Sequence, residues 1–334
     1  MDPLRAEVLR GHPATAALEK LSAAPQALAA AAPRVAVLVP CYNEAFTVAG
    51  VVKSFQAELP SATVYVYDNN STDETAAQAR AAGAVVRKEP LQGKGNVIRR
   101  MFADIDADIY VLVDGDGTYD AASASKMIDK LLDEDLDMVN AARDASEDAS
   151  YRRGHRFGNR LLTGIVSHIF GNRLTDMLSG YRVFSRRFAK SFPGLAHGFE
   201  IETELTVHAL ELRLPMAEIR APYGSRPPGS MSKLGTIRDG IRVLWTILVL
   251  IKEERPLPFF ALIAASLALA SVVLTVPIFI TFMETGLVPR VPTAVLATGM
   301  MLLAFLSFAC GLILDTVTRG RRELKRLHYL SLPK

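Results

Sequence analysis

Residues 109–117 read IYVLVDGDG, an apolar run that ends abruptly in two aspartates separated by a glycine. Five consecutive apolar residues, several of them β-branched or aromatic, favour a strand that is buried on both faces. Similar short runs occupy residues 34–39, 63–67, 84–88 and 138–142, with helical periodicity between them. This alternation predicts an α/β fold with a mostly parallel sheet.

Polar residues directly follow three of these runs. Residues 40–44 read PCYNE, residues 68–73 read DNNSTD, and residues 114–119 read DGDGTY. The carboxyl ends of parallel strands meet at one edge of a sheet, where ligands of such folds bind. Asp114 and Asp116 together suit a hard divalent cation that takes its other ligands from phosphate and water. The alternative interpretation of these two residues is a polar turn that caps the next helix.

The glycines near these clusters do not form a standard nucleotide-binding motif. Gly93-Lys94-Gly95 lacks the Walker frame, and Gly115-x-Gly117 lacks the third glycine of a dinucleotide-binding fingerprint. Lys94 therefore either reaches a phosphate or base, or is an ordinary solvated lysine in a turn. Glu200, Glu202 and Glu204 alternate at the start of a predicted helix, where negative charge also favours the helix dipole.

The C-terminal part of the chain predicts a membrane hairpin. Residues 257–283 and 291–314 carry no charge, and each is longer than the roughly 20 residues that a helix needs to cross a bilayer. Residues 315–334 form a basic tail, which the positive-inside rule places in the cytosol. Two spans then place the large domain in the cytosol as well, and residues 233–256 are predicted to form a helix at the membrane surface.

The remaining composition sets few further limits. Residues 1–33 are rich in alanine, and we interpret them as a loose helix or a leader without evident function. They do not resemble a signal peptide, because Asp2 and Glu7 come early. The net charge of +3 is too mild to indicate a nucleic-acid partner. The cysteines at 41 and 310 form no disulfide or metal-binding pattern.

Taken in order, the motifs resemble those of a known family. Residues 39–44 (VPCYNE), 67–73 (YDNNSTD), 93–95 (GKG) and 113–117 (VDGDG) resemble glycosyltransferase family 2, whose members have the GT-A fold. Residues 175–182 (TDMLSGYR) and 225–234 (SRPPGSMSKL) are similar to its polyprenyl-phosphate branch, which includes dolichol-phosphate mannose synthases and bacterial undecaprenyl-phosphate sugar transferases. The resemblance covers about residues 34–255, so a GT-A domain is expected over residues 34–232. The C-terminal hairpin is similar to that of the bacterial members.

The resemblance implies three groups of site residues. The donor nucleotide sugar would be bordered by Pro40, Tyr42, Glu44, Asp68, Asn70, Lys94, Asp114, Arg226 and Lys233. The acceptor phosphate would meet Arg143, Arg152, Arg153, Arg156 and Ser179. Mg²⁺ or Mn²⁺ would bind Asp114 and Asp116, the second of which also counts as catalytic, and Asp176 stands where the family places its proposed base. One of the glutamates 200, 202 and 204 would also line the site.

The motif around the aspartates differs from that of many relatives. Those relatives have D-A-D-L-Q, whereas this chain has Thr118 in place of the glutamine, so a side-chain amide that often binds the metal is missing. Thr118 or water would substitute for it, which leaves the choice between Mg²⁺ and Mn²⁺ open.

The chemistry of the acceptor decides how Asp176 is interpreted. A lipid phosphate has its second pKa near 6 and is largely anionic at neutral pH, so it hardly needs a base. We therefore interpret Asp176 as a group that orients the acceptor or its arginines. The leaving diphosphate requires positive charge, which the metal, Arg226 and Lys233 would supply.

These observations predict an inverting glycosyltransferase anchored in the bacterial inner membrane. It would move one sugar from a nucleoside diphosphate to a polyprenyl phosphate on the cytosolic face. By analogy with bacterial relatives a UDP-hexose is favoured, and GDP-mannose is also compatible.

The alternatives are a transferase acting on a lipid hydroxyl and an inactive membrane scaffold that binds nucleotide sugar. A processive polysaccharide synthase is disfavoured, because Trp245 lacks the Q-x-x-R-W frame. The sequence does not determine the sugar or the length of the lipid. It is compatible with a homo-oligomer.

Overall fold

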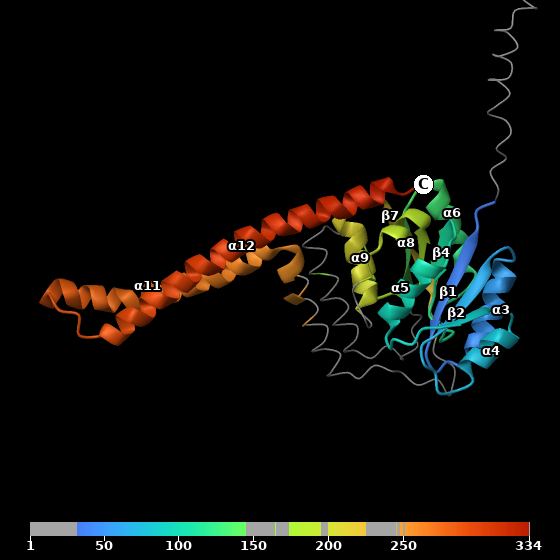
Figure 1. Cartoon of the computed structure of the whole chain (residues 1–334), viewed down its shortest axis with the longest axis horizontal. Coiled ribbons are helices and arrows are strands. Elements are labelled where there is room, and N and C mark those ends of the chain that lie inside the picture. The colour runs from blue at the N-terminus through green and yellow to red at the C-terminus, as the bar shows by residue number, and fades with distance from the viewer. Residues whose placement is uncertain are drawn as a thin grey trace, which may run out of the picture. The chain divides into compact units, whose positions relative to one another are not determined.

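The computed structural model describes residues 32–144, 164, 174–194, 200–224, 245, 248–249 and 251–333. In its first half, strands and helices alternate as the apolar runs predict (Figure 1): β1 (Val35–Cys41), α3 (Val48–Glu58), β2 (Thr63–Asp68), α4 (Thr75–Ala81), β3 (Val85–Lys88), α5 (Lys94–Asp104), β4 (Ile109–Leu112), α6 (Ser123–Asp133) and β5 (Met138–Asp144). The second half contains β6 (Arg182–Ser185), α8 (Arg186–Ser191), α9 (Ile201–Glu211), β7 (Met216–Pro222), α11 (Pro256–Thr285) and α12 (Val291–Ser331).

The strands form one sheet in the order β3-β2-β1-β4-β6-β5-β7. All neighbouring pairs are parallel except those of β6, which runs antiparallel to β4 and β5. The predicted mostly parallel α/β fold is therefore confirmed. The sequence did not predict β6 or α8, because four and six residues are too few to show a periodic pattern.

The position of β6 matters for the site. Arg182, its first residue, pairs with Leu112, the last residue of β4. The chain therefore enters β6 at the carboxyl end of β4, directly beside the DGDG segment. This antiparallel strand brings residues 174–181 to the same edge of the sheet as the aspartates.

Two apolar layers cover the two faces of the sheet. Leu38, Tyr110 and Leu112 point into one layer together with buried residues of α5, α8 and α9. Val37, Val39 and Val111 alternate with them and point into the other layer, which includes buried residues of α3 and α6. Burial on both faces explains why these strands are continuous apolar runs. It also makes the sheet a rigid support for the loops at its carboxyl edge.

Within the described residues, α11 and α12 are the helices long and apolar enough to cross a membrane, with mean hydropathies of 2.5 and 2.1 in their most apolar windows. They contain the predicted spans 257–283 and 291–314. Small buried residues line their contact, and the Ser271 hydroxyl donates to the carbonyl of Ala297 at 2.7 Å. Close packing through small residues is typical of paired helices in membranes.

The basic segment after the second span is not separate from α12. The helix continues through residues 315–331 and contacts the α/β part of the chain. Lys325 binds Glu211 at the end of α9, with an Nζ–Oε2 distance of 2.6 Å. The Tyr329 hydroxyl donates to Asp137 beside β5 at 2.7 Å. Most of the predicted surface helix, 233–256, lies outside the described residues.

Candidate active site

The loop after β4 holds its two aspartates in a tight conformation. A Cβ on Gly115 would lie 2.6 Å from the sulfur of Cys41, so a larger residue does not fit there. Gly117 has a φ of +73°, which favours glycine. The Thr118 hydroxyl donates to Asp116 Oδ1 at 2.6 Å, and the Thr118 backbone N–H donates to the same oxygen at 3.1 Å. Thr118 therefore orients the Asp116 carboxylate.

Lys94 joins Asp114 to a residue from a distant helix. Its ammonium lies 2.5 Å from Asp114 Oδ1 and 2.5 Å from Glu202 Oε1, and its side chain is only 11% exposed. Burial opposes the charged form of Lys94, but the two carboxylates outweigh it and raise the lysine's pKa above its ordinary value. Lys94 is thus a largely buried charged group beside Asp114, and not a solvated turn lysine.

The SGY segment before β6 packs directly against the DGDG loop. The Gly180 N–H donates to the Tyr119 hydroxyl at 2.9 Å. A Cβ on Gly180 would overlap the Asp114 carboxylate, so glycine is required at this point. The side chain of Ser179 is fully buried and accepts a hydrogen bond from the Tyr181 N–H at 3.2 Å.

A buried arginine keeps the SGY segment in place. Arg182 is fully buried and donates to the carbonyls of Met177 and Ser179 and to the Thr206 hydroxyl on α9. Burial lowers the pKa of Arg182 to about 10. Arg182 therefore links this segment by a hydrogen bond to α9, the helix that carries Glu202.

Asp176 is engaged by Arg143 through both carboxylate oxygens. Arg143 Nε lies 2.7 Å from Oδ2, its terminal nitrogen lies 2.9 Å from Oδ1, and its backbone N–H also reaches Oδ2. Glu218 on β7 accepts hydrogen bonds from the Asp176 backbone N–H and from the Asn140 side chain. The fork between guanidinium and carboxylate fixes both groups at the end of β5.

The predicted nucleoside residues lie at the carboxyl ends of β1 and β2 and on the loops that follow. Pro40 is in β1 and pairs in register with Tyr67, one residue before Asp68. The Glu44 N–H donates to the Thr75 hydroxyl at 2.8 Å, which links the two loops. Tyr42 is 36% exposed. Asn70 has a φ of +64° and donates to the carbonyl of Pro90.

Asn69, which sequence reasoning did not single out, connects this region to Lys94. Its amide donates to the carbonyls of Glu89 and Leu91, and its oxygen accepts from the Gly93 N–H at 2.7 Å. The asparagine therefore fixes the turn from which α5 and Lys94 begin. Its presence in the DNNSTD cluster was the one available signal.

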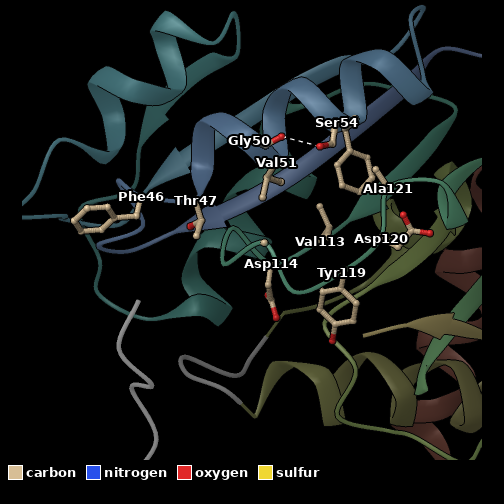
Figure 2. Close-up of a pocket in the computed structure, with 12 residues that line it drawn as sticks. Phe46, Thr47, Gly50, Val51, Ser54, Val113, Asp114, Tyr119, Asp120 and Ala121 are labelled. Atoms are coloured by element: carbon tan, nitrogen blue, oxygen red, sulfur yellow. Dashed lines mark hydrogen bonds between the residues drawn. The ribbon is translucent and has the colours of Figure 1, made fainter. Parts of the chain in front are cut away.

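A cavity of about 390 Å³ lies beside the DGDG loop, between the loop and α3. Its lining includes Phe46, Thr47, Gly50, Gly117 and Tyr119. Figure 2 shows the Asp114 carboxylate and the Tyr119 hydroxyl pointing away from α3. Asp114 also lines the cavity, which therefore adjoins the two-aspartate loop.

Five predicted site residues lie outside the described residues: Arg152, Arg153, Arg156, Arg226 and Lys233. The chain that leads to the last two begins next to the aspartates, because the Gly224 N–H donates to the carbonyl of Thr118 at 2.8 Å. Of the other predicted residues, the structure pairs Lys94 with Asp114 and packs the loop that carries Asp114 and Asp116 against Gly180, next to Ser179.

Comparison with known proteins identifies the family. The model of glycosyl transferase family 2 matches residues 36–192. Protein RfbJ of Shigella flexneri is 56% identical over 105 residues, which are 31% of this chain and 81% of that protein. Glycosyltransferase AglJ of Haloferax volcanii is 33% identical over 227 residues, 68% of this chain and 75% of that protein. The chain therefore belongs to glycosyltransferase family 2 and is a glycosyltransferase.

Solved structures agree with the fold. Glucosyl-3-phosphoglycerate synthase from Mycobacterium tuberculosis, solved in complex with Mn²⁺ and UDP-glucose, superimposes with a TM-score of 0.56. It is 23% identical, and the match covers 66% of this chain and 79% of that one. This likeness confirms the predicted fold of the catalytic domain.

Proposed function

We propose that this glycosyltransferase moves one sugar from a nucleoside diphosphate, foremost a UDP-hexose, to a polyprenyl phosphate. The observation that carries the proposal is the bidentate pair of Arg143 and Asp176. A carboxylate that binds a guanidinium through both oxygens is poorly placed to take a proton. The pair suits an acceptor that is already anionic, because the fixed arginine can attract and orient it.

Asp114 and Asp116 would hold Mg²⁺ or Mn²⁺ on the donor diphosphate. The described residues contain no cluster of three or more histidine, cysteine or acidic side chains that would form a complete metal site. Two hard carboxylates in a glycine-rich loop, one of them oriented by Thr118, still fit an ion that takes its remaining ligands from phosphate and water. The Mn²⁺ and UDP-glucose in the solved relative support this assignment.

When bound, the metal would neutralise charge on the leaving diphosphate. Lys94 contributes a second positive charge at the same place, within a largely buried site. Arg143 would hold the acceptor phosphate opposite the leaving group, so that a single displacement inverts the anomeric centre. Arg226 and Lys233 would close the donor side, and Arg152, Arg153 and Arg156 would extend the acceptor side.

The apolar helices support a lipid acceptor. In the most apolar windows of α11 and α12, only 11% and 17% of the residues are buried, so most apolar side chains face outward. Such surfaces suit a bilayer, where they would hold the site close to a lipid phosphate. The basic residues of α12 after the span support a cytosolic orientation in the inner membrane.

The experiment is to incubate the purified protein with Mn²⁺, undecaprenyl phosphate and a panel of nucleotide sugars, and to read the lipid product by mass spectrometry. A polyprenyl-phosphate sugar is the expected product. Product on ceramide or diacylglycerol, but not on the phosphate, would favour the hydroxyl acceptor. Failure to consume any nucleotide sugar would favour an inactive scaffold. Asp106→Asn should keep the activity of the parent protein, because Asp106 forms a partly exposed ion pair with Arg186, and it serves as the control for the Asp176→Asn variant discussed below.

A further inference from the structure

Glu202 and Lys94 are separated by 108 residues in sequence and meet in the donor site. The glutamate opens α9 and is 5% exposed, and its second carboxylate oxygen has no hydrogen-bond partner among the described residues. A helix N-terminus alone would explain an acidic residue at this point. It does not explain why the carboxylate turns inward to bind a buried lysine.

The ammonium occupies a position that the donor chemistry needs. It lies against Asp114 Oδ1, one of the oxygens expected to face the metal. Two cations cannot both bind that oxygen closely without strong repulsion. Any metal that engages Asp114 must therefore displace Lys94 from it or share the oxygen at a loss of affinity.

We propose that Lys94 is an exchangeable counter-ion which leaves Asp114 for the donor diphosphate, while Glu202 keeps its ammonium in the site. Glu202 is thus a positioning residue that acts through Lys94. This inference rests on the proposed function, because it assumes a diphosphate donor with a divalent metal. It predicts that nucleotide and metal bind cooperatively. A metal on Asp114 releases Lys94 for the diphosphate, and a diphosphate that binds Lys94 releases Asp114 for the metal.

Three variants separate this exchange from a simple effect of local charge. Lys94→Met frees Asp114, Glu202→Gln leaves the lysine paired with Asp114 alone, and the double variant removes both members of the Lys94–Glu202 pair. The double variant has the same net charge as the parent protein, so an effect of charge alone would leave its metal affinity unchanged. Lys130→Met is the control, because Lys130 pairs with Glu134 on the exposed surface of α6.

The measurement is the affinity of the full-length protein in detergent for Mn²⁺, monitored by electron paramagnetic resonance with and without UDP. We expect UDP to tighten Mn²⁺ binding to the parent protein at least tenfold. In Lys94→Met and in the double variant, Mn²⁺ alone should bind about tenfold more tightly than to the parent, and the gain from UDP should shrink. Glu202→Gln should bind Mn²⁺ alone several-fold more weakly, and Lys130→Met should match the parent.

The outcomes distinguish two failures. If the parent protein binds neither Mn²⁺ nor UDP, the proposed function itself is wrong. If the parent binds both but the double variant keeps the parent's Mn²⁺ affinity and the full gain from UDP, the exchange of Lys94 is wrong and the function stands. Thermal unfolding of each variant, monitored by circular dichroism, confirms that the binding data come from folded protein.

Discussion

Asp176 accepts two side-chain hydrogen bonds from Arg143, at 2.7 and 2.9 Å, and both residues stand at the carboxyl edge of the sheet. A pair of this geometry fixes the guanidinium plane as well as its charge. The side chains are 13% and 10% exposed, so solvent screens the pair only weakly. The pair therefore fixes a cation at this edge, where we propose that the acceptor phosphate binds.

Replacing Asp176 by Asn tests this role directly. We expect the acceptor KM to rise about tenfold and kcat to fall less, because a phosphate acceptor needs orientation more than deprotonation. Steady-state kinetics with varied undecaprenyl phosphate measures both values. A general base typically contributes 10²- to 10⁴-fold, so a kcat loss of that size at unchanged KM would argue for a hydroxyl acceptor.

Gly180 offers a sharper steric test of the proposed metal site. An alanine there would overlap the Asp114 carboxylate and force it out of the position in which we propose that it binds the metal. We expect Gly180→Ala to lose at least tenfold in Mn²⁺ affinity measured with UDP. Gly50→Ala is the matched control, since a Cβ at this α3 position meets nothing within 4 Å. That control should bind Mn²⁺ normally and unfold at a slightly higher temperature, because alanine favours helix by about 1 kcal/mol.

Thr118 marks the departure from the D-A-D-L-Q pattern, and its role can be isolated by an isosteric change. Thr118→Val removes the hydroxyl that donates to Asp116 Oδ1 and keeps the shape of the side chain. We expect Mn²⁺ affinity to fall several-fold, whereas Thr118→Ser should retain it. Thr118 is only 3% exposed, so Thr118→Gln should not restore a metal-binding amide and should weaken binding through overpacking.

The parts of this site that sequence could predict are those that follow local patterns. The apolar run before Asp114 indicates a buried strand, and the polar cluster after it indicates a ligand site, because both signals lie within nine consecutive residues. The family resemblance added Asp176 and Arg143, but not the fork that joins them. Their pairing depends on the register of β5 and on the segment before β6.

Other parts depend on contacts between distant segments. Glu202 could be noticed as one of three alternating glutamates, but only the packing of α9 against the sheet shows which of them meets Lys94. Arg182 stands within the TDMLSGYR motif, yet its complete burial follows from β6 lying between β4 and β5. Neither relationship leaves a periodic signal in the sequence.

The contact of α12 with α9 predicts a large effect on stability. The side chain of Glu211 is fully buried and pairs with Lys325 at 2.6 Å and with Arg322 at 3.6 Å. Lys325→Met removes the shorter of these ion pairs, so we expect a loss of about 2 kcal/mol or more. Lys130→Met breaks an exposed pair and should change stability by less than about 1 kcal/mol. Thermal unfolding in detergent compares the two variants, and equal shifts would contradict the importance of this contact.

His208 predicts how stability depends on pH. Its ring packs edge-on against Phe188 and Phe192 and contacts the Ser191 hydroxyl. Burial, with a smaller effect of Lys325, lowers its pKa to about 3. The histidine of the unfolded chain has a pKa near 6.5. Between about pH 3 and pH 6.5 it therefore binds a proton that the folded protein does not bind. Stability is therefore full above about pH 6.5 and is lost at about 1.4 kcal/mol per pH unit as the pH falls toward 3.

Replacing His208 by Gln, which can still hydrogen-bond Ser191, should remove this dependence. At pH 7.5 the variant is expected to be less stable than the parent, because the ring leaves its aromatic contacts. Between pH 6.5 and pH 5 the parent should lose about 2 kcal/mol more than the variant, so the two stabilities converge. Chemical denaturation at several pH values measures the difference. Parallel curves for parent and variant would show that His208 takes up a proton without disturbing the fold.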